Sequence, residues 1–107
     1  MMKNFDVREA VASLGRAVVA SDIKRGAATL SDIDQWKLLS SQIISKLDVD
    51  LVDTVAVWRA LVDLQSICLV GFSFMSNPNY GSKLQDSLKG YFIGLLLEVM
   101  AIERRLL

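Results

Sequence analysis

The chain has 107 residues, of which 12 are basic, 12 are acidic and none is histidine. A chain of this length makes one domain, which we assign to residues 1–107. Because the charges balance, the composition gives no electrostatic case for binding phosphates, and we expect no nucleic-acid partner. Without histidine the commonest general base and metal ligand are missing, so we expect neither an enzyme nor a bound cofactor or metal ion.

Hydrophobic residues make up 52% of the sequence, which is high for so short a domain. Because a small domain has much surface for its volume, this surplus predicts a second buried surface, shared with a second copy of the chain or another protein. The single cysteine, Cys68, lies in an apolar run and can form no intrachain disulfide. Charged residues interrupt any signal peptide within residues 5–25, and we expect a cytoplasmic protein.

The first predicted helix covers residues 5–25. Asp6 and Glu9 have the spacing of a capping box at its start, and Gly26 suits the left-handed residue that follows a helix. Its inner face holds the apolar residues Val7, Val11, Leu14 and Val18.

The second predicted helix covers residues 32–47, with Ser31 and Asp34 as a capping box at its start. Its inner stripe recurs with a helical period and consists of Ile33, Trp36, Leu39 or Ser40, Ile43 and Leu47. The opposite side is polar, so we expect this helix to be half-buried.

Three aspartates, Asp48, Asp50 and Asp53, follow the second helix. Three carboxylates close in sequence could hold Mg²⁺ or Ca²⁺, but their spacing is not that of an EF-hand loop. We interpret them instead as helix-capping residues, with Asp50 capping the third helix.

The third predicted helix covers residues 51–75 and is apolar on nearly all sides, which is typical of a central helix. It is long enough to cross a membrane, but it carries Asp53, Arg59, Asp63 and Gln65. We therefore expect no membrane span.

The segment 76–81 contains the only proline and is the strongest break in the chain. A fourth helix is predicted at residues 83–106, where Ser82 and Gln85 form a capping box. Gly90 and Gly94 are four residues apart, which predicts a close approach by another helix backbone. The apolar stripe of the fourth helix consists of Leu84, Leu88, Tyr91, Leu95, Val99, Ile102 and Leu106.

Short connections between four helices predict an all-α fold, a four-helix antiparallel bundle or an open variant of one. The apolar surplus predicts a small protein-binding regulatory module of the inhibitor, antiactivator or chaperone type. We expect it to form a homodimer and to bind another protein through an apolar helix face. The candidate partner-binding residues are Trp58, Tyr80, Tyr91, Phe92, Leu95 and Val99. The alternative is a small all-α enzyme with an electrostatic site between helices, which would need several inward-facing cations.

Overall fold

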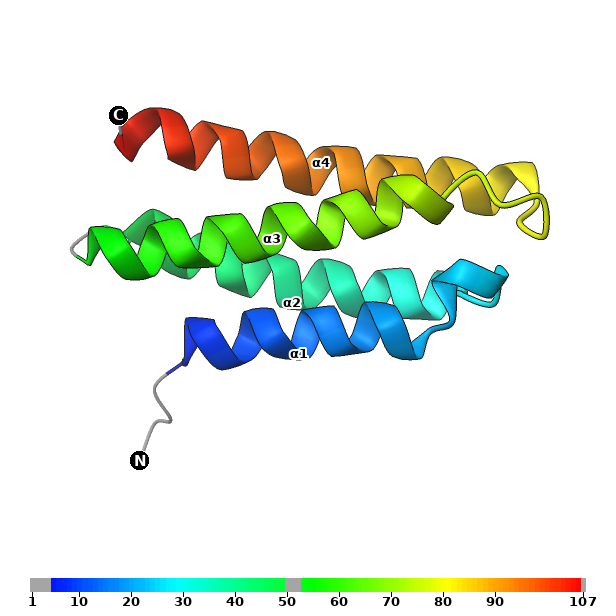
Figure 1. Cartoon of the computed structure of the whole chain (residues 1–107), viewed down its shortest axis with the longest axis horizontal. Helices are drawn as coiled ribbons and strands as arrows, with labels where there is room; N and C mark the ends of the chain where they lie inside the picture. The colour runs from blue at the N-terminus through cyan, green and yellow to red at the C-terminus, as the bar shows by residue number, and fades with distance from the viewer. Residues whose placement is uncertain (1–4, 50–52, 107) are drawn as a thin grey trace.

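A computed structural model describes residues 5–49 and 53–106, and this part of the chain is helical almost throughout. Its four α-helices are α1 (Val7–Ala20), α2 (Leu30–Val49), α3 (Thr54–Phe74) and α4 (Ser82–Leu106). A short 3₁₀ helix, η1 (Ile23–Arg25), separates α1 from α2. Each α-helix runs opposite to the one before it (Figure 1), so the predicted all-α antiparallel bundle is confirmed.

The bundle is flattened, with extents of 43 × 35 × 17 Å. In Figure 1, α1 and α4 lie at opposite edges and α2 and α3 lie between them. The α3–α4 and α1–α2 hairpins pack most extensively, α2 also packs on α4, and α1 packs less extensively on α3. This arrangement gives α3 and α4 a common outer surface at one edge of the molecule.

The first helix ends earlier than predicted. α1 stops at Ala20, and Asp22 adopts a left-handed conformation with φ 57°. Asp tolerates this conformation better than most residues, and it allows Ile23 to turn into the core, where it is 2% exposed. Gly26 is left-handed as predicted, with φ 81°. Asp6 caps α1 as predicted, since the Glu9 amide donates to Asp6 Oδ1 at 3.3 Å, but the Glu9 carboxylate accepts from Arg16 instead of completing a capping box.

The second helix begins earlier than predicted, because Thr29 and Asp32 form its capping box. The Asp32 amide donates to Thr29 Oγ1 at 3.2 Å, and the Thr29 amide donates to Asp32 Oδ2 at 2.8 Å. The prediction that Ser31 and Asp34 cap this helix is therefore wrong. The reciprocal pair satisfies two of the free amides at the helix start.

The third helix is capped by Asp53, whose Oδ1 accepts a hydrogen bond from the Ala56 amide at 3.2 Å. The predicted cap Asp50 lies outside the described residues. Asp48 pairs with Arg105 of α4, which ties the end of α2 to the end of α4. Both side chains are about half exposed, so the pair contributes at most about 1 kcal/mol.

Tyr80 holds the two loops at one end of the bundle together. Its buried hydroxyl donates to the Ile23 carbonyl and accepts from the Ala28 amide, both at 3.1 Å. The predicted box of Ser82 and Gln85 does not form, because the Gln85 side chain reaches back and donates to the Tyr80 carbonyl at 3.0 Å. Gln85 thus orders the loop rather than capping the helix.

An aromatic cluster fills the space between α2 and α4. The ring centroid of Trp36 lies 5.7 Å from that of Tyr91 and 5.9 Å from that of Phe92. Tyr91 and Phe92 meet edge to face at 4.9 Å. The Tyr91 hydroxyl is hydrogen-bonded to the buried Ser40 hydroxyl at 2.5 Å, so neither polar group is left unpaired in the core.

The glycine that admits a close contact between helices is Gly71 of α3, which lies against the Phe92 side chain, and not Gly90 or Gly94 of α4. A Cβ on Gly71 would lie 2.5 Å from three ring atoms of Phe92. At Gly90 or Gly94 it would meet no atom from another part of the described chain within 4 Å. The prediction that these two glycines admit another helix is therefore wrong within this chain.

Gly71→Ala is expected to lower the free energy of unfolding by about 2 kcal/mol, because the overpacking cost exceeds the helix-propensity gain. Urea unfolding followed by circular dichroism measures it. The matched control, Gly94→Ala, is expected to stabilise α4 by about 0.5–1 kcal/mol, since its new methyl group points into open space. Equal effects of the two changes would contradict the packing of Gly71 against Phe92.

Candidate interaction surface

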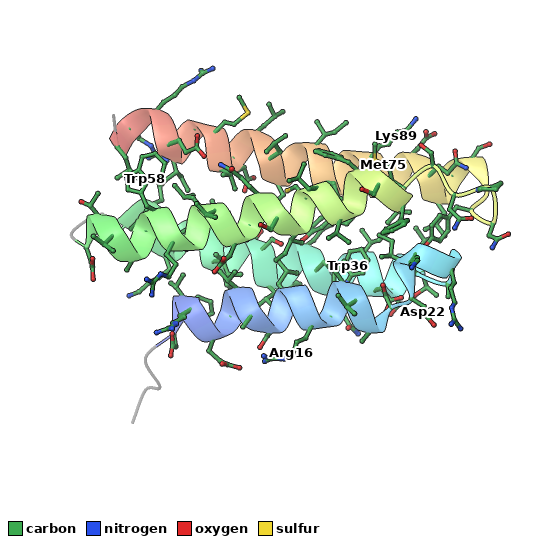
Figure 2. All side chains as sticks on the ribbon, viewed as in Figure 1. Arg16, Asp22, Trp36, Trp58, Met75 and Lys89 are labelled. Carbon is green, nitrogen blue, oxygen red and sulfur yellow. The ribbon has the colours of Figure 1, made fainter. Side chains whose placement is uncertain are left out.

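The structure places five of the six candidate partner-binding residues in the interior. Tyr80, Tyr91, Phe92, Leu95 and Val99 are each exposed by 6% or less. A side chain with so little accessible surface cannot contact a partner while the bundle is closed, so these five residues form the core instead. Trp58 is partly buried and lies near the start of α3, on the side of α4 (Figure 2).

Most of the large apolar side chains that remain exposed in the described residues lie on α3 and α4. We define the α3–α4 face by six of them, exposed by 39–72%: Val55, Val62, Leu69, Ile93, Leu97 and Met100. The two helices lie side by side along their length (Figure 1). Contiguous exposed apolar surface of this kind marks interaction sites more often than scattered single residues do.

A hydrogen bond joins α3 to α4 beside the exposed apolar residues of both helices. The Gln65 amide of α3 donates to the Glu103 carboxylate of α4. Gln65 is one helical turn from Val62 and from Leu69, and Glu103 is one turn from Met100. The exposed residues of both helices therefore flank one seam, and its central polar groups are paired with each other.

A groove of about 250 Å³ lies between α2 and α4. Gly90 and Gly94 form part of its wall, and Lys37 and Glu98 bring one charge of each sign. Catalysis of an anionic substrate would need several cations here, and Lys37 is the only cation among the described residues that line this groove. The groove gives no specific support to the enzyme alternative, which stays a prediction.

Burial lowers the reactivity of the titratable side chains in the described core. Burial raises the pKa of the Cys68 thiol to about 11, so it stays protonated at neutral pH and is a poor nucleophile. Burial also raises the pKa of Tyr91, although its hydrogen bond to Ser40 opposes the shift. Within residues 5–49 and 53–106, no three acidic or sulfur side chains gather as metal ligands.

By length and composition, α3 could cross a membrane, with a mean hydropathy of 1.6. One such helix is weak support for a span, because the core helix of a bundle has the same composition. In this fold, 39% of its most apolar window is buried against the other helices. The expected absence of a membrane span stays a prediction.

No protein-family model, curated protein or solved structure matches this chain.

The sequence missed the α3–α4 face because it identified the interior stripe of α4 as the binding stripe. Leu97 and Ile93 have the same apolar character as Leu95 and Phe92, but they remain 59% and 45% exposed in the folded chain. The sequence did contain a signal for this face, because the apolar surface of α4 is wider than packing against the other helices of the bundle requires.

Proposed function

We propose that this protein is a small protein-binding regulatory module, of the inhibitor, antiactivator or chaperone type, and that the α3–α4 face is a protein-binding surface, for a second copy of the chain or for a different protein. The observation that supports this proposal is the exposure of six large apolar side chains on two adjacent, well-packed helices. A rigid helical pair presents such side chains at little entropic cost on binding.

The free energy that burial of the α3–α4 face can contribute to binding is modest and suits a helical partner. Burying an apolar side chain completely contributes about 1.5–3 kcal/mol, so six roughly half-exposed ones contribute on the order of 6 kcal/mol. Association itself costs at least about 4 kcal/mol, so a stable complex needs polar contacts around this apolar centre. A partner helix or helical pair with its own apolar stripe supplies both.

Site-specific photo-crosslinking in the native host tests the proposal. A photoreactive amino acid at position 97 of α4 is expected to give protein adducts, because Leu97 is 59% exposed within the face. The matched control is position 38, since Leu38 is 70% exposed on α2, outside the face. Adducts should form at position 97, be lost when Leu69→Glu is added, and be absent at position 38.

No adduct at position 97, or equal adducts at both positions, would refute the α3–α4 face as a protein-binding surface. The mass of each adduct also separates a second copy of the chain from a different protein. The adduct mass therefore identifies which of the two occupies the face.

A further inference from the structure

We infer that a second copy of this chain occupies the α3–α4 face, with α4 packed antiparallel on α4 of the second copy about a two-fold axis near residue 95. This inference rests on the proposed function, because it names the partner of the same face. It is carried by the order of exposed residues along α4.

Four exposed residues follow one line along α4: Asp86, Ile93, Leu97 and Arg104. Their intervals are 7, 4 and 7 residues, so the line is symmetric about its midpoint. In an antiparallel pair centred there, Ile93 lies opposite Leu97 of the second copy. Asp86 lies opposite Arg104 of the second copy, and the two-fold axis repeats both contacts.

The end residues of this line, Asp86 and Arg104, form no ion pair with any other residue that the structure describes. Among residues 5–49 and 53–106, the ion pairs found join Arg16 to Glu9 and Arg105 to Asp48, and none involves Asp86 or Arg104. Asp86 and Arg104 are both exposed and opposite in charge. The antiparallel arrangement gives each of them a partner at the rim of the interface, where ion pairs select register and orientation.

Shape is also compatible with this register. Met100, which is 39% exposed, comes level with Gly90 of the second copy. No atom from another part of the described chain lies within 4 Å of the place where a Gly90 Cβ would be. The missing side chain thus leaves room beside Met100, and Val62 and Leu69 of α3 flank the contact.

The area fits a stable dimer. The six side chains of the α3–α4 face present on the order of 500 Å² of apolar surface, against roughly 800 Å² per partner in a standard interface, about 65% of it apolar. The chain carries 12 basic and 12 acidic residues, so two copies do not repel each other at long range. The polar pair within the face, Gln65 and Glu103, is already hydrogen-bonded.

Sedimentation equilibrium at low salt tests the arrangement. The wild-type protein is expected at 23.6 kDa, twice the 11.8 kDa of the chain. Leu97→Glu is expected at 11.8 kDa with an unchanged circular dichroism spectrum, since the side chain is already exposed. The matched control Leu38→Glu, on α2, is expected to remain a dimer.

Charge reversal tests the register. Asp86→Arg and Arg104→Asp are each expected to raise the dimer dissociation constant roughly tenfold, because each one places like charges opposite each other twice. The double variant restores both pairs with reversed sign, and its dissociation constant should return to near the wild-type value. A parallel pairing, or a dimer through another surface, would show no such rescue.

The inference is overturned if the wild-type protein is monomeric at about 100 µM, if Leu97→Glu stays dimeric, or if the double charge reversal fails to restore the dimer. The crosslinking experiment then separates the two proposals. Adducts at position 97 that contain only a different protein would overturn the homodimer and keep the proposed function. No adduct at that position would overturn both.

Discussion

Val99→Asp is expected to leave the chain unfolded at neutral pH. Val99 is 0% exposed on the inner side of α4, and no cation in the described core lies ready to pair with a carboxylate. Burying an unpaired charge costs several kcal/mol, in addition to the lost packing of the valine. The total stability of a domain is only about 5–15 kcal/mol, so this single change removes most or all of it. Circular dichroism should show loss of the helical signal.

The control for this variant is Leu97→Asp, two residues away on the same helix. Leu97 is 59% exposed, so a carboxylate there stays in contact with water. This variant is expected to keep its helical spectrum and a cooperative melting transition. If Val99→Asp melts like Leu97→Asp, the inner side of α4 has been misplaced.

Trp36→Ala is expected to lower the free energy of unfolding by about 3–5 kcal/mol. Trp36 is 2% exposed, and its ring contacts both Tyr91 and Phe92. Its removal leaves a cavity between α2 and α4 that neighbouring rings cannot fill without leaving their own contacts. Urea unfolding, with the midpoint and slope both fitted, measures the loss.

Trp58→Ala serves as the comparison, because Trp58 is also a tryptophan but is only partly buried at the start of α3. We expect a loss less than half as large as for Trp36→Ala. A larger loss for Trp58→Ala would mean that the aromatic cluster around Trp36 is not the centre of the core. It would also place α2 at the periphery of the bundle.

The helical period of the sequence predicted the interior of α1 and α2 well. Val11, Leu14 and Val18 are buried in α1, as expected from their spacing. The same holds for the stripe of α2, whose members Ile33, Trp36, Ile43 and Leu47 are each at most 3% exposed. Each of these helices has one apolar side, so the period alone indicates which residues turn inward.

Helix ends were harder to predict, because neighbouring polar residues compete for the same role. Ser31 and Asp34 fit the capping pattern of α2, but Thr29 and Asp32 form the cap instead. Since Thr, Ser and Asp are all good caps, the geometry of the preceding turn decides which of them is used. In this chain, Tyr80 anchors that turn from a distant loop.

The candidate site could not be predicted residue by residue. On α4, both Phe92 and Leu97 belong to a broad apolar surface, and the sequence offered Phe92 as a partner contact. Phe92 is fully buried because α3 approaches closely at Gly71, whereas Leu97 lies outside that contact. The symmetric spacing of Asp86, Ile93, Leu97 and Arg104 can be read from the sequence once the exposed side of α4 is known.

The helical fold class follows from the sequence alone, since the apolar period and the breaks are local properties. Which apolar residues of α3 and α4 are interior, and which remain at the surface, becomes clear only in the folded chain. Both helices are apolar over more than one side, and burial depends on where a neighbouring helix packs. That position follows from contacts between distant residues, such as Gly71 with Phe92, which no local pattern contains.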